Sequence, residues 1–234
     1  MTLNPSAQAA ESGPDPKVAA ALQRHADGTW TQADVDLIRS IPELAAVVVD
    51  PTKPVEVTTK EALINQNGQA VESNGKPLPA SELDDVLPPH HLTGLPKPGE
   101  VILPAEDDGA PTVSTRAAIT GGTWKMTHVT HTHRSYLGNV IYKYHHWAEF
   151  NYGGGKVRAW RFRDDDITNA NEIVNVGDRR IVDSRTATPA ASATSKMKRK
   201  VELCVLKYGC YSTMYPYVYT TVKGTGRTSF TSGV

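Results

Sequence analysis

The sequence lacks the patterns that mark common enzymes and membrane proteins. Its 234 residues contain no run of 18 or more apolar residues, which excludes an ordinary membrane-spanning helix. The nucleophile elbow GxSxG, the dinucleotide-binding GxGxxG and the phosphate-binding loop are also missing. Only two cysteines are present, so one internal disulfide can form, and it cannot replace a hydrophobic core.

The chain has no net charge, but its charges are unevenly distributed. Residues 1–118 carry 8 Lys and Arg against 17 Asp and Glu, whereas residues 119–234 carry 17 against 8. A basic half of this kind is a candidate for binding anionic polymers or surfaces. The alternative is that the acidic and basic halves form ion pairs with each other and neutralise each other's charge.

The stretch SAQAAES near the N-terminus has the small-x-small form of a signal-peptidase cleavage site. It lacks the basic and apolar regions of a complete signal peptide, so an ordinary N-terminal tail is the alternative. Export would agree with a disulfide, and we predict that the protein is secreted.

The two cysteines, Cys204 and Cys210, flank Tyr208-Gly209, a dipeptide typical of a tight turn. A hairpin at this turn places the cysteines roughly opposite each other, so we predict a disulfide. Two free thiols are the alternative, and the spacing CxxxxxC is wider than that of a zinc knuckle.

Residues 1–50 are predicted to form a tail and a short helical hairpin. Asp15 and Pro16 fit the N-cap and the first position of one helix, and Thr31 with Asp34 fits the capped start of a second. These helices bury too little apolar surface to be stable alone. They therefore dock on another part of the chain or fluctuate.

Residues 51–120 have the composition of a linker. Eight prolines lie between Pro77 and Pro111, and two Asn-Gly dipeptides mark turns. The run VEVTTKEALI is compatible with a strand or a helical segment. We predict an acidic, mostly extended arm that acts as a spacer, threads along a partner or wraps the domain that follows.

From residue 121 onward, the hydrophobic pattern changes to a period of two. Six β-rich runs are separated by short turns, many of them containing Gly or Asn, and no helical stretch interrupts them. The expected fold class is mainly β, with a short helical and largely extended N-terminal arm. Residues 121–234 are predicted to form an antiparallel β-sandwich, or a partly closed barrel, of six to eight strands.

Five of the eight histidines lie in THVTHTHRSYLGNVIYKYHHW, residues 127–147. A hairpin with its turn at residues 137–139 places His131, His133 and His145 together on a solvated outer face. Three imidazoles within about 5 to 7 Å of one another could hold zinc, as in a zinc-dependent hydrolase.

Two observations oppose a metal at these histidines. Glu149 lies four residues from His145, roughly 13 Å along the strand, which is too far for a fourth ligand. Lys125 and Lys143 lie nearby instead of groups that orient ligands. We therefore predict no metal and no cofactor, and we expect solvated imidazoles with pKa values of about 6.5.

Lys196, Lys198 and Lys200 alternate along the run SKMKRK and share one side of a strand. Together with arginines they would form a basic surface for phosphate-bearing polymers. An edge strand protected by lysines against aggregation explains the same pattern. The arginines in this predicted surface are Arg158, Arg161, Arg163, Arg179 and Arg180.

Tyr215, Tyr217 and Tyr219 also alternate, and Tyr211 falls on the same predicted side. Exposed tyrosines would form a sugar-binding platform or a protein interface. Trp147, on the predicted outer face, would belong to the same kind of surface. Half-buried core tyrosines are the alternative.

The stretches YHHWAEFNYGGGKVRAWRF and CVLKYGCYSTMYPYVYTTVKGTG resemble the C-terminal β-rich domain of small, largely uncharacterised secreted proteins of actinobacteria. The resemblance covers Trp124 to Phe230. It implies export, a β-sandwich and the hairpin disulfide, and it implies no activity.

These features predict a secreted, non-catalytic binding or adaptor protein that uses an acidic arm and a basic sandwich. The expected partner is another protein or an anionic or glycan polymer of the cell surface, and we do not expect nucleic acid. A lectin-like module with exposed aromatic residues is the alternative. A zinc-dependent hydrolase is the second alternative.

Overall fold

The computed structural model describes residues 14–88, 101–102, 113–114, 119, 121–205 and 207–234. The helices are α1 (Pro16–Ala26), α2 (Gln32–Arg39), α3 (Pro42–Val47) and α4 (Ala80–Val86). The strands before residue 120 are β1 (Glu56–Ile64), β2 (Ala70–Val71), β3 (Val101–Ile102) and β4 (Val113–Ser114). The later strands are β5 (Thr123–Arg134), β6 (Val140–Gly153), β7 (Lys156–Thr168), β8 (Val174–Arg185), β9 (Ser192–Val205), β10 (Gly209–Met214), β11 (Tyr217–Lys223) and β12 (Thr228–Gly233).

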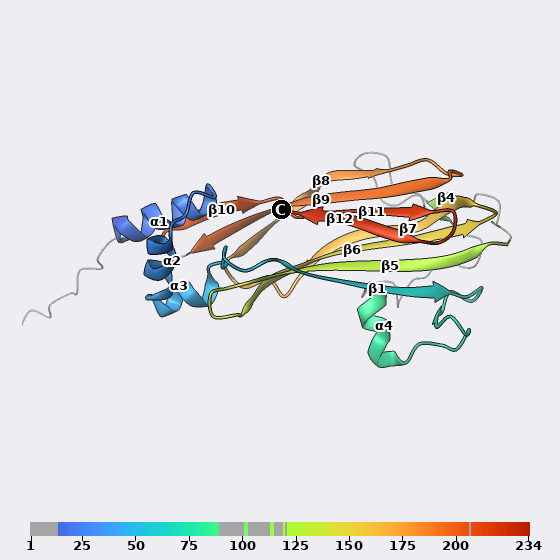
Figure 1. Ribbon diagram of the computed structural model, residues 1–234, viewed down its shortest axis with the longest axis horizontal. Helices are drawn as coiled ribbons and strands as arrows, with labels where there is room; N and C mark the ends of the chain where they lie inside the picture. Colours follow the sequence, from blue (N-terminus) through green and yellow to red (C-terminus); the bar gives the residue numbers. More distant parts are fainter. Residues whose placement is uncertain (1–13, 89–100, 103–112, 115–118, 120, 206) are drawn as a thin grey trace, which may run out of the picture.

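Two antiparallel sheets form a sandwich (Figure 1). The first sheet has the strand order β2-β1-β5-β6-β7. In the second sheet β9 pairs with β8 on one side, and on the other side it pairs first with β11 and then with β10. Strand β12 pairs with β11. Within the described residues the sheets do not close into a barrel, so the predicted β-sandwich is confirmed.

The core lies between the two sheets and extends under the helices. At one end of the sandwich it contains Ala148, Phe150, Val157, Trp160, Ala193 and Val222. Toward the helices it contains Val129, Ile141, Tyr142, Tyr144, Val201, Leu203 and Val218. These side chains come from strands of both sheets, so the inner faces of the two sheets pack against each other, as expected for a sandwich.

Helices α1 to α3 cover the end of the sandwich beside β10 (Figure 1). The side chain of Asp15 caps α1, and Thr31 with Asp34 forms a complete capping box at α2, as predicted. Leu22 and Ile38 are almost fully buried in the same cluster as the sheet residues. The helices are therefore docked, which supplies the burial that they lack alone. Among the described residues, no helix is long and apolar enough to cross a membrane.

The first part of the expected arm belongs to the fold. Strand β1 pairs with β5 along its whole length, from Glu56 opposite Thr132 to Ile64 opposite Trp124. Helix α4 then packs on the outer face of this sheet. Among the alternatives for this arm, a spacer is wrong for residues 56–88, because the end of β1 and α4 contribute apolar side chains to a buried cluster. This part of the arm packs along the domain that follows, and most of VEVTTKEALI forms strand β1. The expectation for residues 89–100, 103–112, 115–118 and 120 lies outside the described part of the chain.

Candidate functional site

The β5–β6 hairpin contains a bulge that changes which side chains share a face. Arg134 pairs with Val140, but the next pair is His133 with Tyr142, so Ile141 is an extra residue on β6. One extra residue shifts the pairing of the two strands by one position. Beyond the bulge, side chains that would have shared a face then lie on opposite faces of the sheet. The face predicted for His131 and His133 on β5 is therefore wrong, whereas the outer face predicted for His145 on β6 is confirmed.

The three histidines considered for zinc do not come together. His131 and His133 point into the sandwich and are 1% and 2% exposed, whereas His145 faces the other side of the sheet. Burial lowers the pKa of His131 and of His133 to about 4. The expectation of solvated imidazoles is wrong, and the described residues contain no group of three potential metal ligands.

His145 instead belongs to a hydrogen-bond chain on the outer face of the first sheet. Nδ1 of His128 lies 2.6 Å from the carbonyl oxygen of Asp85, which only accepts, so this nitrogen donates. Nε2 of His128 is then an acceptor for Nδ1 of His145, 2.8 Å away. Nε2 of His145 in turn accepts from the Thr168 hydroxyl at 2.7 Å. These hydrogen bonds attach α4 to the sheet, and both histidines are neutral in this arrangement.

Trp147 is buried beneath α4. Its ring stacks on His128 at 4.5 Å and on His145 at 5.2 Å between ring centroids. Only 2% of the residue is exposed, because Val86 and Leu87 at the end of α4 cover it. The prediction that Trp147 belongs to a binding surface is therefore wrong.

Three of the arginines assigned to the basic surface lie in internal ion pairs, and the side chain of Arg179 lies outside the described part of the structure. The pairs are Arg161 with Glu149, Arg163 with Asp183, and Arg180 with Asp164 and Asp165. The Arg161 and Glu149 side chains are 4% and 0% exposed. In the acidic half, Glu61 pairs with Lys125 at 2.6 Å and Glu56 with Arg134 at 3.0 Å. These contacts favour mutual neutralisation of the two halves over a broad basic surface.

Four strand residues of the second sheet and one residue of the β10–β11 connection form an outward surface that we call the lysine–tyrosine face. The strand residues are Lys196, Lys198, Tyr217 and Tyr219, and the connection contributes Tyr215. Lys196 pairs in register with Tyr219, and Lys198 pairs with Tyr217. The Lys196 ammonium lies 5.4 Å from the Tyr219 ring centroid, and the Lys198 ammonium lies 5.1 Å from that of Tyr215. The Tyr217 and Tyr219 rings are 4.8 Å apart. The predicted lysines and tyrosines thus meet on one surface.

The side chains of this face remain accessible. Lys196 is exposed, Tyr215 is 39% exposed, and the other three residues are half-buried. Tyr211 was predicted on the same side, but it lies in the core with 6% exposure. A register shift between Cys210 and Ser212 makes Tyr211 the bulged residue and turns it inward.

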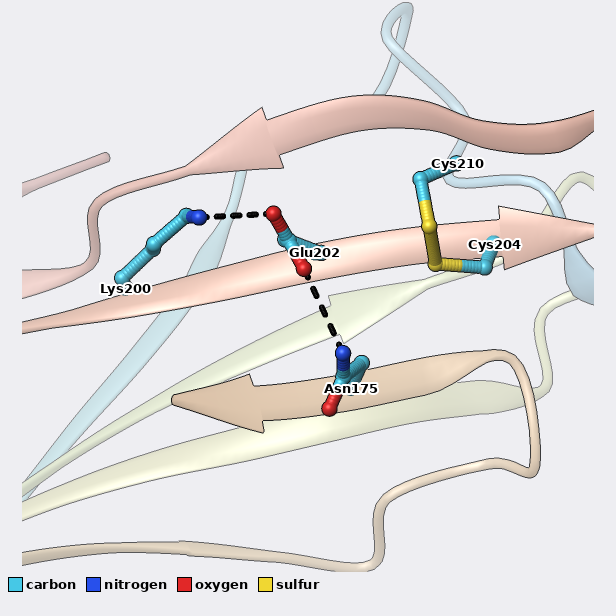
Figure 2. Close-up of a disulfide and its surroundings, with 5 residues drawn as sticks. All are labelled: Asn175, Lys200, Glu202, Cys204 and Cys210. Atoms are coloured by element: carbon cyan, nitrogen blue, oxygen red, sulfur yellow. Dashed lines mark hydrogen bonds and ion pairs between the residues drawn. A yellow bond between two sulfur atoms is a disulfide. The ribbon is translucent and has the colours of Figure 1, made fainter. Parts of the chain in front are cut away.

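Lys200 continues the row of lysines but is engaged with a carboxylate. Its ammonium lies 2.6 Å from Glu202, which also accepts a hydrogen bond from Asn175 at 3.3 Å (Figure 2). The hydrogen bond to Glu202 raises the pKa of Lys200. We therefore leave Lys200 outside the lysine–tyrosine face.

Cys204 and Cys210 form a disulfide between β9 and β10 (Figure 2). They are register partners on the two strands, on either side of a turn with Gly209 at a positive φ of 71°. The predicted bridge is confirmed.

Comparison with models of protein families, with curated proteins and with solved structures finds no match to this chain. The resemblance of the C-terminal half to secreted proteins of actinobacteria therefore stays a prediction. Any functional conclusion has to come from the surfaces of the molecule.

Proposed function

We propose that this protein is a secreted, non-catalytic binding protein that holds an anionic polysaccharide on the lysine–tyrosine face. The observation that carries the proposal is the pairing of Lys196 with Tyr219 and of Lys198 with Tyr215. Each pair places a positive charge beside an accessible aromatic ring. The disulfide between Cys204 and Cys210 supports secretion, because such bonds persist in oxidising compartments.

The two kinds of side chain recognise different parts of one ligand. The ring faces of Tyr215 and Tyr219 offer apolar surface to sugar rings, and phenol hydroxyls donate and accept hydrogen bonds. The ammonium groups of Lys196 and Lys198 pair with sulfate, phosphate or carboxylate groups. These lysines are two residues apart on one strand, roughly 6.8 Å, so their charges suit an extended polymer with repeating anionic groups.

The experiment compares two polymers with the same backbone, dextran sulfate and neutral dextran. Dextran sulfate should bind to the wild-type protein with an affinity that falls as salt increases. The substitutions Lys196→Ala and Lys198→Ala should each weaken binding about three- to tenfold, because each removes one charge contact. Lys76→Ala is the matched control, since Lys76 is exposed beyond β2 and its loss changes the net charge equally.

Equal affinities of the Lys76→Ala and Lys196→Ala variants would contradict the proposal. The close Tyr217 and Tyr219 rings favour one alternative, a lectin-like module for neutral glycans. Tight binding of neutral dextran that is lost in Tyr219→Ala and retained in Lys196→Ala would establish this alternative instead.

A further inference from the structure

A pocket of about 420 Å³ lies where the helices meet the second sheet. It is lined by the end of α1, by residues 49–55 and by β10 with the residues that follow it. Its apolar wall includes Trp30, Val55, Met214 and Tyr215. A volume of this size falls within the range of about 300 to 1,000 Å³ that small-molecule sites occupy.

Two histidines in the pocket wall have an unused ring nitrogen. His25 and His133 both line the pocket, and the Nε2 atom of each is buried without a hydrogen-bond partner among the described residues. His133 is 2% exposed, and it also lines a neighbouring cavity of about 210 Å³. A buried polar atom without a partner is destabilising, so such an atom beside a cavity points to a ligand that supplies the missing bond.

The protonation of these histidines indicates which group is missing. Burial lowers the pKa of both, that of His133 to about 4, so both imidazoles are neutral at pH 7. The Nε2 atom of a neutral imidazole donates in one tautomer and accepts in the other. A hydroxyl group can both donate and accept, so it satisfies the Nε2 atoms of His25 and His133 in either tautomer.

The charged side chains at the pocket, Asp50 and Lys53, pair with each other, so they do not require a charged ligand. The buried carboxylate of Asp50 accepts from the Thr52 backbone at 3.0 Å and from its hydroxyl at 2.6 Å. Arg39 at 3.3 Å and Lys53 at 3.7 Å complete its surroundings. Large apolar side chains that are exposed also line the pocket: Val55 at 37%, Tyr215 at 39% and Val234 at 52%. Such accessible apolar surface is typical of binding sites.

We infer that this pocket binds a small, uncharged aromatic molecule that carries a hydroxyl group, with the hydroxyl bonded to His25 or His133 and the ring against Trp30 and Tyr215. The pocket is a different site from the lysine–tyrosine face. Of the five residues of that face, only Tyr215 lines the pocket. Binding in the pocket does not depend on the proposed function.

The test uses 2-naphthol and its methyl ether, 2-methoxynaphthalene, as probes in a fluorescence titration of the full chain. In the ether a methyl group replaces the hydroxyl proton, so only 2-naphthol can donate a hydrogen bond. The wild-type protein should bind 2-naphthol about tenfold more tightly than the ether, the difference that one hydrogen bond makes. Either His25→Phe or His133→Phe should bring the two affinities within about twofold of each other, and a tenfold preference that persists in both variants would overturn the inference.

Another variant keeps the test valid if these histidine variants fail to fold. Thr213 is exposed and lines the pocket, so Thr213→Trp should fill it and abolish binding of both probes. The same variant should still bind dextran sulfate, whereas Lys196→Ala should bind 2-naphthol as the wild type does. Equal affinities for both probes in the wild type, no saturable binding, or 2-naphthol binding that survives Thr213→Trp would each overturn the inference.

Discussion

The ammonium nitrogen of Lys198 lies 5.1 Å from the centre of the Tyr215 ring. Tyr215 also lines the pocket that contains His25 and His133. One tyrosine therefore borders both proposed binding sites, the surface for a polymer and the pocket for a small molecule.

This position makes Tyr215 different from Tyr219. We expect Tyr215→Ala to weaken the binding of both dextran sulfate and 2-naphthol, each about threefold or more, because a ring contact is lost at both sites. Tyr219→Ala should weaken only the binding of dextran sulfate, since Tyr219 does not line the pocket. Parallel titrations of the two variants check this, and a loss of 2-naphthol binding in Tyr219→Ala would contradict the arrangement.

The buried histidines make stability depend on pH. Burial holds the pKa of His131 and His133 at about 4 and that of His146 at about 3, all below the unfolded value of 6.5. Above pH 6.5 both states are neutral at these groups. Below it the unfolded chain binds protons first, so the free energy of unfolding falls until pH reaches about 4 for His131 and His133, and about 3 for His146. Each histidine contributes up to about 1.4 kcal/mol per pH unit.

His131→Phe tests this relationship. Both ring nitrogens of His131 are buried and lack partners within the described residues, and the ring makes an edge contact with Tyr144 that phenylalanine can keep. Urea unfolding at about pH 7.5, 6 and 5 gives the free energy of unfolding of the variant. This free energy should fall less steeply with decreasing pH than that of the wild type, and it should equal the wild-type value at pH 7.5. An unchanged slope would mean that His131 is protonated in the folded protein. Lys76→Ala should leave the slope as it is.

Trp147 should contribute to stability, not to ligand binding. Trp147→Ala removes a ring that packs on His128, Val86 and Leu87, so the free energy of unfolding should fall by about 3 to 5 kcal/mol. Tyr219→Ala, on the accessible face, should lower it by less than about 1 kcal/mol. Chemical denaturation measures both. Native stability of Trp147→Ala together with lost dextran sulfate binding would restore the original surface interpretation.

The disulfide closes a small loop, with a sequence separation of 6 between its cysteines. Replacing both Cys204 and Cys210 with serine should lower the free energy of unfolding by about 2 kcal/mol, mainly because the unfolded chain gains freedom. Denaturation of the oxidised protein and of the double variant gives this difference. Equal free energies of unfolding for the oxidised protein and the double variant would show that the disulfide adds no stability to the paired strands β9 and β10.

Local patterns in the sequence were sufficient for several features. The caps at Asp15 and Thr31 depend on side chains within three residues of the helix start, so their residue types alone indicated them. The turn at Gly209 and the disulfide follow from one short hairpin. Lys196 and Lys198 share a face because side chains of a regular strand alternate.

The same alternation failed wherever a bulge interrupted it. Ile141 in β6 and Tyr211 in β10 are extra residues, and each shifts its strand by one position. No residue type in these stretches indicates a bulge, so the predicted faces of His131, His133 and Tyr211 are wrong. The pocket was also hidden, because its walls come from α1, residues 49–55 and β10, which are far apart in the sequence.

The sequence by itself determined the antiparallel β architecture, the helix starts and the disulfide, because each depends on neighbouring residues and on a repeat of two. Only the tertiary structure decided which faces are buried. Trp147 became a core residue when α4 packed on it, and Lys198 stayed partly accessible because it lies on the face of β9 opposite the buried Met197. Burial is a property of what packs against a surface, and that contact joins segments whose separation along the chain leaves no local pattern.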